Sequence, residues 1–297
     1  MLDIMGHPIT FSKPRRVSQS GWIEHIPFAF AIMDLHRPGI FVELGTHTGV
    51  SYCAFCQAAT ELMLPAKCHA VDTWKGDEHA GFYAEAVFEE LNGYHAANYS
   101  HFSSLMRMTF DEASGYFTDG TIDLLHIDGF HTYDAVRHDF DTWLPKMSPR
   151  GVVLLHDSFA RERDFGVGLL LEELRAHYPV FEFTHGYGLA VVGVGPLLAQ
   201  EPLFDLFRAD GPETVAIRTL FSSLGARISS ENALTERNAT VAERDAIIAT
   251  CNATIAERDV KIARLRKQRQ LFTYIIISSV AVFSLISLFM LGHHNWF

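Results

Sequence analysis

The chain has 297 residues, enough for one large domain or two small ones, and its 48% hydrophobic content can fill a real core. Its formal net charge of -11 argues against a nucleic-acid partner, because a protein that binds a phosphate backbone needs a basic surface. Four cysteines are too few for a disulfide scaffold and suit a reducing compartment.

Residues 1–20 are polar and irregular, and we expect a loose N-terminal arm there, without the apolar stretch of a signal peptide. From Trp22 to Leu35 the apolar residues recur at helical spacing, and Pro38 and Gly39 favour a stop shortly afterwards. This pattern predicts a helix ahead of the first strand, in a domain that begins at residue 21.

A glycine turn follows the first expected strand. The strand, Ile40 to Leu44, is short and apolar, the turn contains Gly45 and Gly49, and a helical pattern begins at Val50. Such a turn before a helix N-terminus can hold a nucleotide-like cofactor, because the free N–H groups favour negative charge. The spacing is E-x-G-x-x-x-G, with Glu43 before the first glycine, and differs from the dinucleotide motif G-x-G-x-x-G. The fragment alone would also fit an ordinary glycine turn.

The next strands carry further candidate cofactor residues. Cys68 to Asp72 reads as a strand that ends in an acid, and Thr73 follows it. Asp72 could accept hydrogen bonds from both hydroxyls of a ribose, or it could simply cap a helix. Ser103 to Met108 is the expected third strand, and the helix that opens with Phe110 and Asp111 would lie near an adenine in a fold of this kind.

Two later strands end in acids and histidines. A nearly continuous apolar strand beginning at Ile122 ends at Asp128, and His131 follows. The strand that begins at Gly151 ends in His156 and Asp157. Parallel strands end at the same edge of a sheet, so we expect these four polar side chains near the glycine turn. Two acids and two histidines suit a divalent cation, a general base, or both, whereas a single strand-terminal Asp would suit a turn.

The domain ends with a helix from Gly166 to His177 and a hairpin of two strands between Phe181 and Gly193. An antiparallel ending is not expected of a dinucleotide fold built from two similar halves. It is typical of the class I methyltransferase fold. The element order therefore favours an α/β, Rossmann-like fold of this kind.

Residues 21–195 resemble a bacterial branch of the class I S-adenosylmethionine (SAM) methyltransferases, one often encoded near or fused to surface-polysaccharide glycosyltransferases. The similar segments are GWIEHIPFAF, VELGTHTGVSYCAFC, AVDTWKGDEHAGFY, LLHIDGFHTYDAVRHDFDTWLPKMSPRGVVLLHDS and FGVGLLLEEL. The resemblance implies a seven-stranded sheet with one antiparallel strand and SAM over the strand ends, with its methionine part near the glycine turn and its ribose on Asp72. The expected cofactor residues are Glu43, Gly45, Thr46, Gly49, Ser51, Asp72, Thr73, Phe110, Asp111 and Asp128.

The resemblance also implies a chemistry. Related sugar O-methyltransferases bind Mg²⁺ through an Asp at the position of Asp128 and an Asp-Asp pair after the next strand. Here that pair is His156 and Asp157, and histidine is a poorer ligand for Mg²⁺, which leaves open whether Mg²⁺ or another divalent cation is needed. We expect methyl transfer to the hydroxyl of a sugar or glycan acceptor, with His131 as the first candidate base and Asp128 as the second.

Two other functions are alternatives. A metal-dependent hydroxylase or hydrolase could use the same fold and the same acids and histidines. A non-catalytic scaffold of a polysaccharide-synthesis complex could retain the fold without its activity, although Glu43, Gly45, Gly49 and Asp72 argue against this.

The remaining chain is expected to leave the domain. Residues 196–227 read as a helical linker, and residues 228–268 contain a 14-residue repeat typical of a helical stalk. Four apolar residues recur every seven positions in it: Val241, Ile248, Ile255 and Ile262. The neighbouring line is polar, so the stalk could be a weak coiled coil that joins copies of the chain or a solvated spacer.

Residues 271–291 carry no charge and are long enough to cross a bilayer, which predicts a transmembrane helix before a short tail of residues 292–297. The basic run from Arg264 to Arg269 lies directly before this span. By the positive-inside rule we expect a single-pass protein of the bacterial inner membrane, with its catalytic domain in the cytoplasm, where SAM is found.

Overall fold

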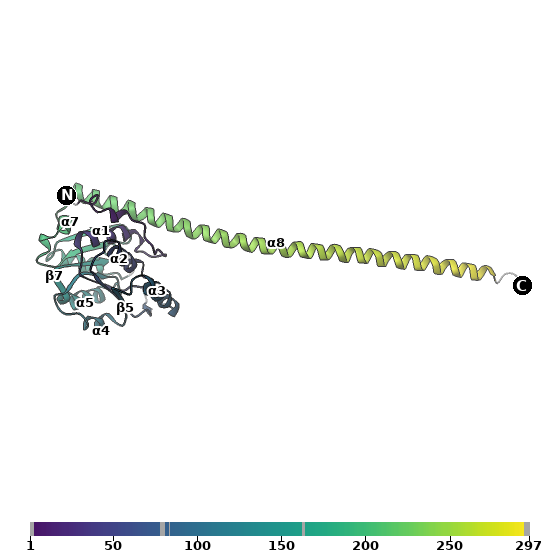
Figure 1. The fold of residues 1–297 in the computed structure, drawn as a ribbon, viewed down its shortest axis with the longest axis horizontal. Helices are drawn as coiled ribbons and strands as arrows, with labels where there is room; N and C mark the ends of the chain where they lie inside the picture. Colours follow the sequence, from purple (N-terminus) through teal and green to yellow (C-terminus); the bar gives the residue numbers. More distant parts are fainter. Residues whose placement is uncertain (1–2, 78–80, 83, 162–163, 294–297) are drawn as a thin grey trace. The chain divides into compact units, whose positions relative to one another are not determined.

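The computed structural model describes residues 3–77, 81–82, 84–161 and 164–293. The chain divides into two compact units, residues 1–232 and residues 233–297. The first unit carries the sheet and its helices, several of which are labelled in Figure 1.

A seven-stranded sheet forms the centre of the first unit. In spatial order its strands are β5 (Ser103–Arg107), β2 (Lys67–Asp72), β1 (Ile40–Leu44), β6 (Ile122–Ile127), β7 (Met147–His156), β9 (Leu189–Gly193) and β8 (Val180–Phe183). The neighbours from β5 to β7 pair in parallel, and β9 is antiparallel to both β7 and β8. This confirms the predicted Rossmann-like sheet with one reversed strand.

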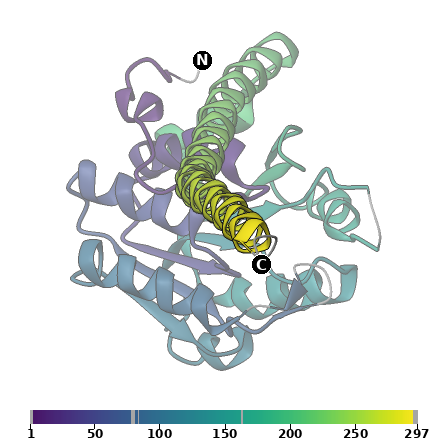
Figure 2. The same ribbon diagram turned by 90° about the vertical axis from the view of Figure 1, so that its right-hand side faces the viewer.

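Helices cover both faces of this sheet (Figure 2). Phe41, Leu124 and Leu154 pack into one buried cluster with α1 (Ile26–His36) and α2 (Val50–Glu61). Their neighbours along the strands, such as Val42 and Leu125, pack into a second cluster, with α4 (Phe110–Ser114), α5 (Tyr133–Trp143) and α6 (Val167–Leu174). Because successive side chains of a strand point to opposite faces, apolar residues at every position give a sheet that is buried on both sides.

Shorter elements complete the chain. They are η1 (Pro8–Phe11), η2 (Ile23–His25), β3 (Gly76–Asp77), β4 (Gly81–Phe82), α3 (Glu85–Asn98), η3 (Leu144–Lys146), η4 (Leu198–Gln200), η5 (Pro202–Phe204), α7 (Asp205–Arg208) and α8 (Gly211–His293). The short β3–β4 pair precedes α3, which begins at Glu85.

The N-terminal segment is not the loose arm that its polarity suggested. Ile4 and Ile9 are buried in the core. The Arg16 guanidinium donates to the carbonyl of Thr48 in the glycine turn, at 2.9 Å from Nη2. Scattered apolar residues between polar ones carry no periodic signal, which is why the sequence did not show this packing.

The stretch expected as a linker also belongs to the first unit. Leu203 and Leu206 are buried in the core, as are Ile217 and Phe221 of α8. The compact unit therefore extends to residue 232, well beyond the expected domain end at residue 195.

The second unit is the remainder of α8. Val241, Ile248, Ile255 and Ile262 are exposed on it, as are most of the described apolar side chains of residues 271–290. By length and composition, α8 is the one helix in the described part of the chain that could cross a membrane.

Candidate active site

A cavity of about 540 Å³ lies at the carboxyl ends of the strands. Its size is within the usual range of small-molecule sites. Ten of the expected residues line it: Gly45, Thr46, Ser51, Asp72, Thr73, Phe110, Asp128, His131, His156 and Asp157. Glu43, Gly49 and Asp111 were also expected at the ligand, but they do not line this cavity.

The glycine turn is shaped by two positive φ angles, 87° at Gly45 and 78° at Gly49. A Cβ on Gly45 would collide with the backbone carbonyl of Asp128, so only glycine lets the β1 turn lie against the loop after β6. A Cβ on Gly49 would instead meet the Leu91 side chain of α3. The small size of Gly49 therefore serves the packing of α3 against the turn.

Asp72 joins the end of β2 to the glycine turn. Its Oδ2 accepts hydrogen bonds from the backbone N–H groups of Thr46 and His47, both at 2.9 Å, and its Oδ1 accepts one from Trp74 at 2.6 Å. Asp72 thus holds the glycine turn against the end of β2 and does not cap a helix, since α2 begins only at Val50. A carboxylate oxygen can accept more than one hydrogen bond, so the predicted ribose contact is compatible with this bonding.

Phe110 and Asp111 are neighbours at the start of α4, but their side chains lie in different surroundings. The Phe110 ring lines the cavity. The Asp111 side chain is 64% exposed and lies 2.8 Å from Nε2 of His138 on α5. Asp111 therefore does not reach the cavity in this structure, because its carboxylate pairs with a neighbouring helix.

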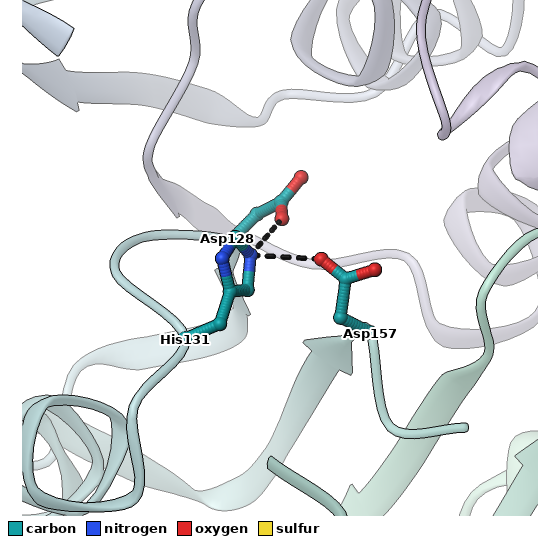
Figure 3. A group of neighbouring side chains, drawn as sticks. All are labelled: Asp128, His131 and Asp157. Carbon is teal, nitrogen blue, oxygen red and sulfur yellow. Dashed lines mark hydrogen bonds and ion pairs between the residues drawn. The ribbon is translucent and has the colours of Figure 1, made fainter. Parts of the chain in front are cut away.

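Asp128, His131 and Asp157 converge at one end of the cavity (Figure 3). Nε2 of His131 lies 2.8 Å from Oδ2 of Asp157 and 3.3 Å from Oδ1 of Asp128. Nδ1 of His156 lies 3.1 Å from the same Asp128 oxygen and 3.3 Å from the same Asp157 oxygen. Two carboxylates thus face two imidazoles, as the strand ends predicted.

The contacts between these two carboxylates and two imidazoles shift the pKa values of all four side chains. Burial alone would raise the pKa of Asp128, but His156 and His131 outweigh it and hold this pKa well below its usual range. Burial likewise opposes the effect of the two histidines on Asp157, whose pKa is also lowered. Burial would lower the pKa of His131, yet hydrogen bonds to both carboxylates raise it to about 9. The pKa of His156 is raised for the same reason.

Three of these residues could hold a metal ion. One ligand atom from each of Asp128, His131 and Asp157 lies within 4.8 Å of the others. Octahedral ligands at about 2.1 Å from Mg²⁺ are about 3 Å apart, which suits the separations from His131. The expected set contained His156, whereas the group found among the described residues contains His131, although Nδ1 of His156 also lies near both carboxylates.

Several residues that line the cavity were not predicted from the sequence. Gly21 and Trp22 line it from the N-terminal segment, Phe165 from the loop before α6, and Tyr187 from the β8–β9 turn. Tyr187 sits between two glycines at a positive φ of 66°, which marks a tight turn. The glycines were the only signal available, and they predicted a hairpin without indicating a ligand.

A parallel sheet with one reversed strand in its final hairpin, and a cavity at the strand ends, defines the class I methyltransferase fold. Residues 42–158 match the family model described as a methyltransferase domain. This part of the chain is therefore similar to methyltransferase domains.

The chain is 46% identical over 181 residues to the uncharacterized protein y4gI of Sinorhizobium fredii. The match covers 61% of this chain but only 20% of that protein, so the chain spans about a fifth of the length of this curated relative. Among solved structures, the S-adenosylhomocysteine (SAH)-bound Podospora anserina methyltransferase PaMTH1 is similar at 13% identity and a TM-score of 0.44, covering 57% of this chain and 77% of that one. The O-methyltransferase TomG from Streptomyces achromogenes, in complex with SAM, is similar at 14% identity and a TM-score of 0.44, covering 65% and 88%.

Proposed function

We propose that this protein is a membrane-anchored, SAM-dependent O-methyltransferase that acts on a sugar hydroxyl of a glycan or lipid-linked saccharide. One observation carries the proposal: a single cavity joins the glycine turn, where a SAM molecule would lie, to Asp128, His131 and Asp157. SAM supplies an activated methyl group, and the polar cluster is suited to receive the proton of an acceptor hydroxyl.

In the proposed reaction the acceptor oxygen attacks the methyl carbon in line with the leaving sulfur. The C–O bond forms, the C–S bond breaks, and the products are a methyl ether and SAH. The hydroxyl proton passes to the cluster, with Nε2 of His131 as the proton acceptor once His131 is in its neutral form. That nitrogen lies 3.3 Å from Oδ1 of Asp128 and 2.8 Å from Oδ2 of Asp157, and all three residues line the cavity. A divalent cation on Asp128, His131 and Asp157 would supply a second way to lower the cost of ionising the hydroxyl.

The lining of the cavity supports a neutral acceptor. The side chains of Trp22, Phe165 and Tyr187 offer aromatic surfaces with few polar tips, a surface on which a sugar ring could pack. Among the described residues that line the cavity there is no Lys or Arg to hold a phosphate or a carboxylate. An uncharged ring that carries hydroxyls fits this composition better than an anionic acceptor does.

The last part of α8 supports the membrane location. Residues 271–288 are apolar and exposed in the described structure, and the basic run from Arg264 to Arg269 precedes them. We propose a single span of the bacterial inner membrane with the catalytic unit in the cytoplasm. The exposed line of Val241, Ile248, Ile255 and Ile262 would let the stalk pair with a second copy of the chain.

The test uses the full chain in detergent micelles. Calorimetry should show saturable SAH binding with a dissociation constant of about 1 μM, on the order of -8 kcal/mol. The protein is then incubated with trideuteromethyl-SAM and saccharide-bearing lipids extracted from the bacterium that encodes it, and hydrolysed sugars are analysed by mass spectrometry. Deuterated methyl ethers of sugars are expected. Absence of SAH binding by the folded protein, or label found only outside sugars, would refute the proposal.

A further inference from the structure

The turn between β8 and β9 holds an aromatic residue in a backbone conformation that favours glycine. Tyr187 has a φ of 66° and lies between Gly186 at 55° and Gly188 at 95°. In this left-handed region a Cβ comes close to the following carbonyl oxygen, which costs free energy for every residue except glycine. Glycine, or asparagine, which tolerates this region well, would therefore suit the backbone at position 187 better than tyrosine.

Contacts with neighbouring segments fix this backbone conformation. The carbonyl oxygen of Tyr187 accepts a hydrogen bond from the backbone N–H of Phe159 at 2.9 Å. A Cβ on Gly188 would collide with the same backbone nitrogen, so the turn lies directly against the loop after β7. In addition, Nε2 of His25 lies 3.0 Å from the carbonyl oxygen of Gly186. A strained residue persists only where such contacts hold it, and residues of this kind cluster at functional sites.

The Tyr187 side chain contributes little to the fold. The residue is 57% exposed. Its hydroxyl makes no hydrogen bond to the described residues, and its ring contacts no other aromatic ring among them. The ring lies against the backbone of Gly21, where a Cβ would be 3.2 Å from Cδ2 of the tyrosine. The strain at position 187 is therefore not explained by what the side chain does for stability.

Other non-glycine residues with a positive φ show a reason for it. Arg37 and Met63 follow the ends of α1 and α2, where a left-handed residue commonly terminates a helix. Asp157 lines the cavity and places its Oδ2 2.8 Å from Nε2 of His131. Tyr187 follows no helix, and it shares with Asp157 a place in the cavity wall. A role toward a ligand of the cavity would give Tyr187 a reason of the same kind.

The Tyr187 ring lies close to the carboxylates of Asp128 and Asp157. The same Cβ on Gly21 that would be 3.2 Å from the tyrosine ring would be 3.8 Å from Cε1 of His156. Nδ1 of His156 faces both carboxylates, at 3.1 and 3.3 Å. An acceptor whose hydroxyl reaches these carboxylates would therefore place its adjoining atoms beside the tyrosine ring.

We propose that Tyr187 is a specificity-determining residue whose ring binds the apolar face of the acceptor ring, beside the hydroxyl to be methylated. The inference rests on the proposed function and narrows the acceptor to a saccharide whose ring offers a face of C–H groups. Such a face can pack on an aromatic ring and bury apolar surface of both partners. A linear acceptor, or one that carries a charge next to the hydroxyl, would not gain this contact.

Replacement of the ring by asparagine separates this role from a structural one, because the two roles predict opposite effects on stability. Tyr187→Asn removes the ring but suits the left-handed backbone, so the full chain in micelles should unfold about 3 °C higher. SAH affinity should stay within about twofold. With trideuteromethyl-SAM and saccharide-bearing lipids extracted from the bacterium that encodes the protein, KM for the lipids should rise by about tenfold or more. The value of kcat should change by less than about threefold, since the contact holds the acceptor both before and during the reaction.

Two variants serve as controls. Tyr187→Phe keeps the ring, so KM for the lipids should stay within about twofold of the value for the unchanged protein. Met63→Asn is matched for backbone strain, because Met63 has a φ of 50°, is 88% exposed and does not line the cavity. It should raise the unfolding temperature by a similar amount and leave KM unchanged.

Four results would overturn the inference. An unfolding temperature lowered together with SAH affinity in Tyr187→Asn would mean that the side chain serves the fold. A KM that does not change in this variant would remove the contact with the acceptor. A KM that rises as much in Tyr187→Phe would assign the contact to the hydroxyl and not to the ring. If the unchanged protein binds SAH but labels no sugar, the proposed function fails, and the inference that rests on it fails with it.

Discussion

Asp139 of α5 provides a quantitative test of the structure, because it is a buried acid without a neutralising partner. It is 8% exposed, and no hydrogen bond or ion pair of its carboxylate is found among the described residues. It lies behind the cavity wall, where its Oδ2 would be 3.5 Å from a Cβ on Gly129. Burial raises its pKa from 3.8 to about 7, and the neighbouring His138 only partly opposes this. Ionising the Asp139 carboxyl therefore costs free energy in the folded protein.

The sign and size of the effect follow from linkage. Between the unfolded and folded pKa values the folded state holds more protons, so stability is highest below about pH 4 and falls as the pH rises toward 7. The folded and unfolded pKa values of Asp139 differ by about three units, so this group lowers the free energy of unfolding by on the order of 4 kcal/mol at pH 8. At pH 5, which lies between the two pKa values, the loss is about 2 kcal/mol. Asp139→Asn imitates the protonated acid, so it should stabilise the protein by these amounts.

Thermal unfolding followed by near-ultraviolet circular dichroism, on the full chain in one detergent, measures this difference. At pH 8 the variant should unfold about 10 °C above the unchanged protein, and the gap should shrink at pH 5. Asp141→Asn, on the same helix but half exposed and paired with Arg137, is the control and should show no pH-dependent gap. A gap for Asp139→Asn that is equal at both pH values would refute the reasoning.

Three further outcomes are expected. Gly45→Ala should lower the free energy of unfolding by more than about 2 kcal/mol and abolish SAH binding, because the new methyl group would meet the Asp128 carbonyl and residue 45 has a positive φ. Denaturant unfolding measures the first effect and calorimetry the second. His131→Gln and Asp157→Asn should keep SAH affinity within about threefold but lower transfer of the deuterated methyl group by about 100-fold or more. If the stalk pairs with a second copy, mild oxidation of the exposed Cys251 in membranes should give a disulfide-linked dimer, and a monomer only would speak against pairing.

The sheet could be predicted because its strands are local patterns. The apolar run Ile40–Leu44 matches β1 to the residue. The acids and histidines of the site could also be predicted, since each lies at or shortly after the end of a strand and parallel strands share an edge. Such features need only a short window of sequence and one rule of topology.

The parts that were missed depend on contacts between distant segments. The hydrogen bond between Trp22 and His126 spans 104 residues, and no spacing in the sequence indicates it. Leu203 and Phe221 read as a linker because the surface that buries them cannot be seen from their own segment. His131 and His156 could not be ranked as ligands, because the choice depends on which ring nitrogen faces the carboxylates.

The charge balance at these carboxylates constrains the chemistry of the site. The lowered pKa values of Asp128 and Asp157 and the raised pKa values of His131 and His156 give two negative and two positive charges. His131 can accept a proton from an acceptor hydroxyl only after it has released its own. The atom that would do so, Nε2, is also the atom that faces both carboxylates and would bind a metal ion. A histidine base and a metal ligand are therefore exclusive roles of one nitrogen, and a metal bound there, which would also engage Asp128, would leave the proton to water.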